Sequence, residues 1–378
     1  MHFDLSDDQR LLVDTVTSFL KKESPIERFR KLRDDDDGIG WSRDVMRKFG
    51  ELGWLAVPFS EDDGGLGGGM IDVALILEQL GTALVPEPYL ASIVLGGLAV
   101  ARAGTAEQRG IFLPSVIDGS KTLALAHLEE ASRYDAHRVS TRAERSGGGY
   151  RIRGHKRWVL NGHAADHLVV VARTSGSDDD RKGISLFLVD RDAPGVSITT
   201  VRTMDGHRAA MVAFDVEVAE DRRLGAEGSG LPVLEGVLDA ATAAVCAEGL
   251  GLMTQSLALT RDYLVQREQF GVKIGAFQAL QHRCVDMFVE TELARGTTIL
   301  AALRANDADE RERKRGVSVA KVHLGGGGRL VVQQAIQLHG GIGITDEADI
   351  GLFFKRMHVL QALFGDEDWH LSRVASLG

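Results

Sequence analysis

The sequence predicts an α+β protein in which an N-terminal helical domain, a middle antiparallel β domain and a C-terminal helical bundle follow one another. Helical spacing of apolar residues in the first third predicts the first section. Short β-branched runs between Gly, Asp and Ser turns predict the second, and long Ala- and Leu-rich stretches predict the third. The expected boundaries are 1–120, 121–226 and 227–378.

The first section begins with a helix start signal. Ser6 followed by Gln9 fits a capping box, and apolar residues then recur at helical spacing. The stretch 50–70 contains a proline and several glycines, which predict a loop. The run "IDVALILEQLGTAL" at 71–84 predicts another helix, with Gly81 placed just after its last full turn.

The middle section changes to the pattern of strands. The turn-rich stretches "SGGGY" (146–150) and "SGSDDDRKG" (175–183) are expected to connect hairpins. No segment of helix length lies between the strands, so an antiparallel sheet is expected. The four clearest strand runs are 167–175, 183–192, 196–203 and 209–218.

The last section contains three long helical stretches, at 237–267, 277–306 and 315–340. Short links between long helices predict a bundle. Gly325–Gly328 lies inside the last stretch, where each glycine costs about 1 kcal/mol relative to alanine. Two explanations stay open: close packing against another helix, or a break in the helix.

Composition restricts the functional class. Hydrophobic residues make up 44% and charged residues 26%, as in soluble globular proteins, and the net charge of −10 argues against nucleic acid as a partner. No apolar run reaches the length of a membrane span, and the acidic start "MHFDLSDDQR" lacks the basic character of an export signal, so a cytoplasmic location is expected. Cys246 and Cys284 have no metal-like spacing, which predicts two reduced thiols and no metal site.

Several segments resemble the acyl-CoA dehydrogenase family. "REQFGVKIGAFQALQHRCVDM" (267–287) resembles its Arg-x-x-Phe-Gly … Phe-Gln-x-x-Gln-His … Asp-Met segment, and "QLHGGIGITDE" (337–347) resembles its Gln-x-x-Gly-Gly-x-Gly segment. "YRIRGHKRWVLNG" (150–162) resembles the strand and turn that carry a flavin-stacking tryptophan. The stretches 4–20 and 52–67 resemble the family's first helix and first long loop.

This resemblance implies the acyl-CoA dehydrogenase fold, in which a C-terminal four-helix bundle follows an N-terminal helical domain and a middle β domain. It also implies bound FAD and an acyl-CoA thioester as substrate. In the family a carboxylate removes the α-proton while the flavin accepts a hydride from the β carbon. It also implies an electron-transfer flavoprotein or similar acceptor. Because FAD is shared between subunits in this family, at least a dimer is expected, formed with a second copy or with a sister chain.

The resemblance assigns cofactor contacts residue by residue. Trp158 would pack against the flavin ring, which its motif context favours over the alternative of a core tryptophan, and Val159, Leu160 and Asn161 would follow the flavin edge. Leu160 lacks the hydroxyl that the family often has there, so only backbone NH groups remain as donors. The further predicted FAD contacts are Arg267 at the pyrophosphate, Phe270, Gln278, Gln337, Gly340, Gly341, Asp366 and Asp368.

The substrate loop departs from the family pattern. Where the family has Thr-Glu-Pro-Gly-x-Gly-Ser-Asp, this chain has "HLEEASRYD" (127–135). Ser132 is predicted to line the thioester channel, whereas Glu129 and Glu130 are expected to face solvent, away from the polyanionic CoA. Thr242 stands where some members carry a basic residue and is also assigned to the substrate.

The family's usual base is missing. Phe364 occupies the position of the Glu that precedes a Gly, and Ala241 occupies the alternative position on the long helix. Asp366 is the predicted substitute, although it and its neighbours could equally cap a helix. Asp239 is the runner-up and a predicted substrate contact, and Glu248 lies seven residues beyond Ala241.

Three functional hypotheses follow from this gap. The first is α,β-dehydrogenation of an acyl-CoA, by this chain alone or as one subunit of an α2β2 assembly acting on bulky or steroid-derived acyl-CoAs. The second is a flavin-dependent monooxygenase or oxidase of the same fold. The third is a non-catalytic FAD-binding partner subunit.

Overall fold

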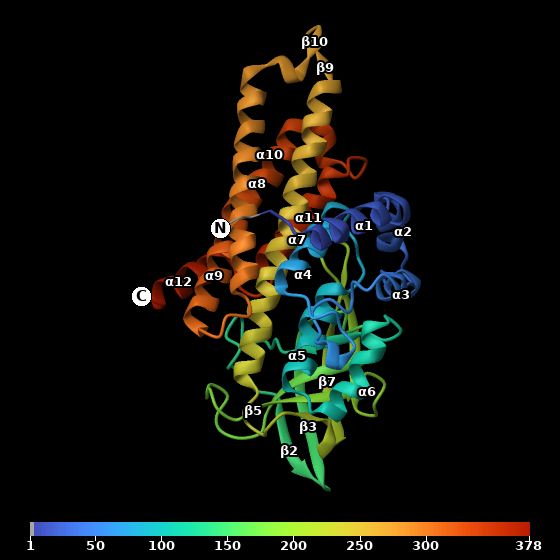
Figure 1. The fold of residues 1–378 in the computed structure, drawn as a ribbon, viewed down its shortest axis with the longest axis vertical. Helices are drawn as coiled ribbons and strands as arrows, with labels where there is room; N and C mark the ends of the chain where they lie inside the picture. Colours follow the sequence, from blue (N-terminus) through green and yellow to red (C-terminus); the bar gives the residue numbers. More distant parts are fainter. Residues whose placement is uncertain (1–3) are drawn as a thin grey trace. The chain divides into compact units, whose positions relative to one another are not determined.

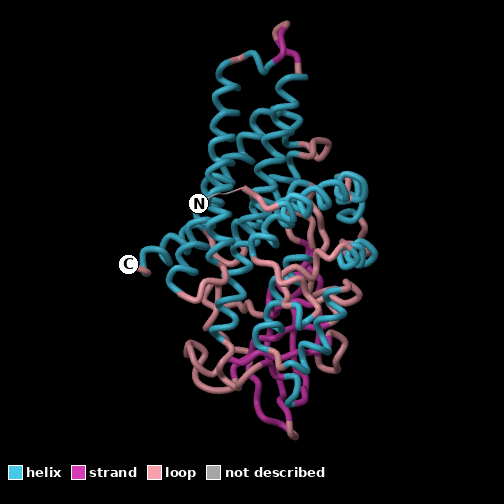
Figure 2. The backbone as a smooth tube through the Cα atoms, viewed as in Figure 1, coloured by secondary structure: helices cyan, strands magenta, loops and turns pink. Residues whose placement is uncertain are grey.

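The computed structural model describes residues 4–378 (Figures 1 and 2). Contacts divide the chain into two compact units. The helical unit comprises the chain up to Asp34, Met70–Val85 and Thr242–Gly378, and the sheet unit comprises Asp35–Gly69 and Pro86–Ala241. The predicted α+β class is confirmed, whereas the three predicted domain ranges remain a proposal about organisation.

The helical unit collects helices from both ends of the chain. Figure 1 shows its long helices α7 and α8 running to the small β9–β10 hairpin that joins them. The elements are α1 (Asp7–Glu23), α2 (Ile26–Asp34), α4 (Met70–Thr82), α7 (Leu231–Gln266, which starts in the sheet unit), β9 (Glu268–Gln269), β10 (Val272–Lys273), η4 (Ile274–Ala276), α8 (Gln278–Arg304), α9 (Glu310–His323), η5 (Leu324–Gly328), α10 (Arg329–His339), η6 (Gly340–Ile344), α11 (Ile350–Ala362) and α12 (Glu367–Ser376).

The sheet unit combines short helices with an eight-stranded sheet, whose strands are magenta in Figure 2. Its helical elements are α3 (Arg43–Glu51), η1 (Glu61–Asp63), the π-helix η2 (Leu90–Gly97), α5 (Leu98–Ala103), α6 (Ala106–Ile117) and η3 (Glu220–Arg222). The strands are β1 (Leu123–Ala126), β2 (Arg142–Ser146), β3 (Gly149–Leu160), β4 (His167–Arg173), β5 (Ile184–Asp190), β6 (Val196–Arg202), β7 (Arg208–Ala219) and β8 (Arg223–Leu224).

The sheet follows the order β6-β7-β3-β2-β4-β5-β8, with β1 pairing β4. The four predicted strand runs are confirmed, as are the turn at 147–148 and the β4–β5 connection. Most pairs are antiparallel, but β1 and β4 pair in parallel, as β2 and β4 do at one position. The parallel β1–β4 pair forms because the β2–β3 hairpin lies between these strands in sequence, which gives the chain room to return in the same direction.

One glycine prediction in the helical unit is wrong, whereas the N-terminal capping box is confirmed. The capping box is confirmed, since Ser6 Oγ accepts from Gln9 N and Gln9 Oε1 accepts from Ser6 N. The prediction that Gly81 follows α4 is wrong, because Gly81 lies within it. A Cβ on Gly81 would lie 2.2 Å from the Glu248 carbonyl oxygen, and one on Gly251 would lie 2.0 Å from the Glu78 carbonyl oxygen. Glycine is therefore required where α4 crosses α7.

The four-glycine stretch shows close packing inside a helix that widens without breaking. Leu324–Gly328 forms the π-helical segment η5 between α9 and α10. Added Cβ atoms would lie 2.8 Å from Glu367 Cβ at Gly325, and 2.9 Å from Met357 Sδ at Gly328. Without a Cβ, these glycines leave room for side chains of α11 and α12 to pack against η5.

The long helix α7 is a core element. By length and composition it is the one helix among residues 4–378 that could cross a membrane. However, 94% of its most apolar window is buried inside the protein. Such burial is typical of the central helix of a packed domain.

Candidate functional site

A β-bulge presents Trp158 at the surface of the sheet unit. Lys156 pairs with Val212 and Val159 pairs with Ala210, so that Arg157 and Trp158 together oppose a single residue of β7. Trp158 has a left-handed φ of 51° and is 46% exposed. The indole is therefore not a core side chain, and its exposed face is available to a planar ring.

The two residues after Trp158 return to the sheet. Val159 is buried in the core of the sheet unit, whereas Leu160 is half-buried at the end of β3. The chain then turns at Asn161, whose φ is 58°, and the amide of Gly162 donates to the carbonyl of Val159 at 3.0 Å. Val159 and Leu160, which are predicted to follow the flavin edge, thus lie directly after the bulge.

The substrate loop differs from expectation at Glu129. Only 6% of Glu129 is exposed, and its Oε1 accepts from Lys156 Nζ at 2.6 Å, so the expectation that this carboxylate faces solvent is wrong. Burial alone would raise the pKa of Glu129, but the Lys156 ammonium and donors at 140–141 lower it to about 2. Glu130 does face solvent, at 3.0 Å from Arg157.

Ser132 is held within the same loop. Its hydroxyl donates to the Glu129 carbonyl at 3.0 Å and accepts from the Glu129 amide at 2.9 Å. The side chain is 5% exposed. In this conformation Ser132 shapes the loop, and contact with a substrate remains a proposal.

A shallow groove of about 340 Å³ lies on the outer face of the sheet beside the bulge. Strands β3, β6 and β7 form it, and Arg157 and Glu130 stand on its wall. Arg157, which lines the groove, directly precedes Trp158 in the chain. Its lining residues are Glu130, His155, Lys156, Arg157, Ser197, Thr199, Met211, Val212 and Ala213.

The helical unit brings two groups of predicted FAD residues to one end. Tyr263, near the end of α7, stacks on His339 at the end of α10 with ring centroids 4.5 Å apart. This contact holds the segment carrying Arg267 and Phe270 near the segment carrying Gly340. Arg267, Phe270, Gln278, Gln337, Gly340 and Gly341 are all exposed.

The exposed glycines at this end differ in what explains them. Gly340 has a φ of 64° and ends α10, so the end of this helix is enough to explain a glycine there. A Cβ on Gly341 would meet nothing within 4 Å, and its φ is not in the left-handed region. Phe270, at the hairpin tip, is 91% exposed.

The turn at Phe364–Gly365, which is predicted from the resemblance to match the family's base position, is tightly held. Phe364 has a φ of 59° and Gly365 a φ of 123°. Lys321 Nζ, from α9, donates to the carbonyl oxygens of Leu360, Gln361 and Gly365 at 2.8, 2.9 and 2.8 Å. The ammonium thus both caps the end of α11 and fixes the turn.

The imidazole of His370 holds the same turn from the other side. Its Nε2 lies 3.2 Å from the Phe364 carbonyl oxygen, and its Nδ1 lies 3.0 Å from Ser318 Oγ. Burial, followed by the charge of Lys321, lowers the pKa of His370 to about 3. The neutral ring therefore donates through Nε2 to Phe364 and accepts at Nδ1.

A free thiol completes the surroundings of Lys321. Burial lowers the pKa of Lys321 to about 8 and raises the pKa of Cys246 to about 12. Cys246 is therefore a protonated thiol beside the ammonium, and both cysteines are free. Neither the thiol nor the ammonium offers a proton acceptor at neutral pH.

The predicted substitute base Asp366 is a helix cap. Its carboxylate accepts from the Trp369 amide at 2.9 Å and begins α12. Glu367, in the first turn, lies 3.1 Å from Arg329. Asp368 is exposed in the same turn. The capping interpretation therefore applies to Asp366, and a role at the flavin for Asp366 or Asp368 remains a proposal.

The remaining candidates lie on α7. Ala241 is fully buried, and Asp239 and Thr242 are each 2% exposed. Glu248 is bound to Arg356 of α11 at 2.6 Å, which commits its carboxylate to an ion pair. Asp239 is thus the buried carboxylate nearest in sequence to Ala241.

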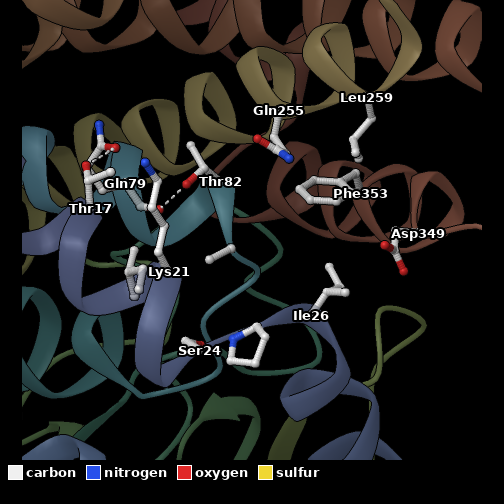
Figure 3. Close-up of a pocket in the computed structure, with 13 residues that line it drawn as sticks. Thr17, Lys21, Ser24, Ile26, Gln79, Thr82, Gln255, Leu259, Asp349 and Phe353 are labelled. Atoms are coloured by element: carbon white, nitrogen blue, oxygen red, sulfur yellow. Dashed lines mark hydrogen bonds between the residues drawn. The ribbon is translucent and has the colours of Figure 1, made fainter. Parts of the chain in front are cut away.

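A separate pocket of about 420 Å³ lies in the helical unit among α1, α4, α7 and α11 (Figure 3). Lys21, Gln79 and Gln255 supply polar groups, while Leu259 and Phe353 supply apolar surface. None of the predicted site residues lines it. The candidate flavin surfaces are therefore elsewhere, at the Trp158 bulge and the exposed ends of α7 and α10.

Sequence reasoning missed two side chains that hold the Phe364 turn, Lys321 and His370. Lys321 is a single cation in the apolar run "GVSVAKVHLG", and such a buried lysine is a recognisable signal. His370 belongs to "LFGDEDWH", directly after the capping acids. Their partners lie far away in sequence, so the pairing itself could not be foreseen.

Models of three domains match this chain in order. The N-terminal domain of acyl-CoA dehydrogenase matches residues 6–120, the middle domain 124–216 and the C-terminal domain 228–377. Together with the bulge tryptophan and the exposed ends of α7 and α10, these matches define a flavoprotein oxidoreductase class. The chain belongs to the acyl-CoA dehydrogenase family.

Individual relatives agree with this assignment. A probable acyl-CoA dehydrogenase, YngJ, from Bacillus subtilis is 30% identical over 354 residues, covering 92% of this chain and 91% of that protein. FadE12, an acyl-CoA dehydrogenase of Mycobacterium tuberculosis, is 31% identical over 80% of this chain and 79% of its own length.

Two solved structures are also similar. A variant of the Tcur3481-Tcur3483 steroid acyl-CoA dehydrogenase (ACAD) superposes with a TM-score of 0.87 and 31% identity, covering 98% of this chain and 97% of that chain. The ChsE4-ChsE5 complex from Mycobacterium tuberculosis gives a TM-score of 0.88 and 26% identity, covering 100% of this chain and 98% of that chain.

Proposed function

We propose that this chain is the FAD-binding subunit of a hetero-oligomeric acyl-CoA dehydrogenase in which a sister chain supplies the catalytic base. The observation that carries the proposal is Phe364. A side chain that cannot accept a proton occupies the family's base position, on a turn held by Lys321 and His370. Ala241 fills the alternative position, and Asp366 serves as a helix cap.

The residues of this chain suit FAD. Trp158 offers an exposed indole face for the flavin ring, and the exposed Arg267 offers a guanidinium for the pyrophosphate. Gly341 leaves open space for close approach by the adenosine side. When bound, FAD supplies the hydride-accepting chemistry of the reaction. An electron-transfer flavoprotein is the proposed final acceptor.

A stripe of exposed apolar side chains on α8 supports an oligomer. Its residues recur every three or four positions along one helix face, and so predict a helix–helix contact. Gly296 lies within the stripe, and a Cβ there would meet nothing within 4 Å. An exposed mid-helix glycine is unfavourable without a close neighbour, which a second chain would provide. The α8 stripe comprises Val285, Phe288, Val289, Leu293, Leu300 and Leu303.

The similar structures suggest the type of partner and substrate. One of them is described as a complex of two named chains, and the other is named a steroid acyl-CoA dehydrogenase with two chain names. We extend both features to this chain as proposals: an α2β2 assembly, and a bulky or steroid-derived acyl-CoA. Ser132 and Thr242 are the proposed substrate contacts.

A second candidate is a dehydrogenase that works without a sister chain. Asp239 favours it, because this carboxylate lies two residues before Ala241 on α7 and is 2% exposed. In this version Asp239 or Asp366 would remove the α-proton. The two candidates make opposite predictions for carboxylate substitutions in this chain.

Asp366→Asn separates the two candidates cleanly. Asparagine caps a helix about as well as aspartate, so the fold is retained while proton acceptance is lost. In the enzyme co-purified with its sister chain, dye-coupled turnover is expected to stay within about twofold of wild type. Removal of a general base would instead lower turnover by about 10²–10⁴-fold. Asp239→Asn is tested in parallel, and a collapse with either variant would refute the sister-chain base.

The cofactor part of the proposal has its own readout. The purified chain, alone or assembled, should carry a flavin absorption band that is released on denaturation as FAD. A protein that is folded by circular dichroism yet neither retains nor rebinds FAD would contradict this part. In that case the turnover measured with Asp366→Asn would come from an assembly in which this chain carries no flavin.

A further inference from the structure

We infer that Lys156 and Asn161 are positioning residues for Trp158, since they pin the two ends of the bulge and so set the direction of the exposed indole. The inference rests on the proposed function, because the ring that Trp158 is proposed to meet is the flavin of FAD. Lys156 lies two residues before Trp158, and Asn161 lies three residues after it. All the contacts involved lie within the sheet unit.

The first anchor is a buried ion pair. Lys156 is 1% exposed, and its Nζ donates to Glu129 Oε1 at 2.6 Å and to the His127 carbonyl at 3.2 Å. Glu129 is itself fixed, because it accepts from the amides of Ser140 and Thr141 at 2.8 and 3.1 Å. The strand is thereby tied to the substrate loop immediately before the bulge.

A backbone hydrogen bond extends this anchor into the bulge. The Arg157 amide donates to the Leu128 carbonyl at 2.8 Å. A bulge leaves an amide of its strand without a ladder partner. Here Leu128 of the loop 127–135 supplies the acceptor, so this hydrogen bond connects the loop to the bulge.

The second anchor is a buried amide. Asn161 is 4% exposed, its Oδ1 accepts from Trp41 Nε1 at 3.1 Å, and its Nδ2 donates to Thr122 Oγ1 at 3.2 Å. Its carbonyl also accepts from the amides of Ala164 and Ala165. Asn161 thus joins the end of β3 to two distant segments of the sheet unit.

Both anchors are needed because the bulge is conformationally costly. Trp158 and Asn161 both have left-handed φ values, 51° and 58°. Such backbone persists only where the surroundings over-determine it. A bulky side chain at Trp158 gains nothing locally from this conformation. The conformation places an aromatic face at the surface, which is the arrangement that a flavin partner requires.

The test uses the full chain with three anchor variants and one control. Trp41→Phe removes only the donor to Asn161, and Asn161→Gly removes the amide while keeping a residue that accepts the left-handed φ. Lys156→Met is made together with Glu129→Gln, so that no buried charge is left unpaired. Tyr89→Phe is the matched control, because it removes one buried hydrogen bond of the same unit, from Tyr89 Oη to the Trp54 carbonyl at 3.0 Å.

Two readouts are taken on every variant. Amide hydrogen exchange of 157–162 is expected to accelerate about tenfold with each anchor variant, as expected for the loss of one buried hydrogen bond. Titration with FAD should show a dissociation constant raised by a similar, about tenfold factor and a visible band closer to that of free FAD. Tyr89→Phe should lower thermal stability about as much as the anchor variants do. Its amide exchange at 157–162 and its FAD dissociation constant should nevertheless stay within about twofold of wild type.

The outcomes are separable. Unchanged exchange at 157–162 in the anchor variants would overturn the inference. Faster exchange with wild-type FAD affinity and an unchanged flavin band would also overturn it, because the anchors would then serve the fold alone. If wild-type protein binds no FAD, the proposed function fails, while the exchange rates still decide whether the anchors hold the bulge.

Discussion

At the scale of single residues, the informative position is Phe364. A non-glycine residue with a φ of 59° costs about 1–3 kcal/mol, and it persists here because Lys321 and His370 hold the turn. The turn is thus held tightly although the side chain at Phe364 carries no carboxylate. The family pattern drew attention to Phe364 in the sequence. It could not place Lys321, whose carbonyl partners lie 39–44 residues away.

His370 predicts a loss of stability in mild acid. Its pKa is lowered from 6.5 to about 3, so between these values the unfolded chain binds a proton that the folded chain does not. This contribution is complete above pH 6.5 and is lost as the pH falls towards 3, at up to about 1.4 kcal/mol per pH unit. Urea unfolding at pH 4–7 should show this slope, and His370→Gln should flatten it.

The control is a histidine outside the Phe364 turn. His155→Gln replaces an exposed imidazole on β3 and leaves His370 in place, so the slope assigned to His370 should remain. An equal slope for wild type and His370→Gln would contradict a buried neutral imidazole at the Phe364 turn.

At the scale of elements, periodicity and turn chemistry predicted what the structure shows. The capping box at Ser6 and the four strand runs depend on local patterns, and local patterns are what a sequence displays. Gly81 was misplaced because its cause is not local: the Glu248 carbonyl of α7 approaches it. Glu129 was placed in solvent for the same reason, since its partner Lys156 lies 27 residues away.

The α4–α7 crossing predicts opposite effects for two glycine substitutions. Gly81→Ala forces a Cβ to 2.2 Å from the Glu248 carbonyl oxygen and should destabilise the protein by about 1–3 kcal/mol. Gly110 is exposed on α6, and a Cβ added there would meet nothing within 4 Å. Gly110→Ala should therefore stabilise the protein by up to about 1 kcal/mol. Chemical denaturation measures both, and similar effects of the two changes would refute the close crossing.

At the scale of the whole molecule, the α8 stripe predicts the assembly state. Leu293→Asp places a charge in the centre of the stripe and should lower the mass measured by light scattering to that of a smaller species. Leu11→Asp is the matched control, because Leu11 is 67% exposed on α1 and outside the stripe. A Leu293→Asp protein with unchanged mass and normal FAD content would remove α8 from the interface.

The composition and order of segments were sufficient to predict the architecture, and the family motifs were sufficient to predict FAD. The identity of the base could not be predicted, since it depends on which side chains, from which chain, surround the acyl group. Asp366 looked like a substitute acid in the sequence, yet its carboxylate accepts from the Trp369 amide. Our central proposal is therefore that the turn at Phe364, which Lys321 and His370 hold, is a base position without a base.

Anaerobic flavin reduction in the isolated, FAD-loaded chain tests that claim most directly. Acyl-CoA substrates, including a steroid-derived one, are added to wild type and to Phe364→Glu, and bleaching of the flavin band is followed. The wild-type flavin should stay oxidised, while Phe364→Glu should bleach, because general-base catalysis contributes about 10²–10⁴-fold. Bleaching of the wild-type chain at a rate equal to that of Phe364→Glu would contradict the account.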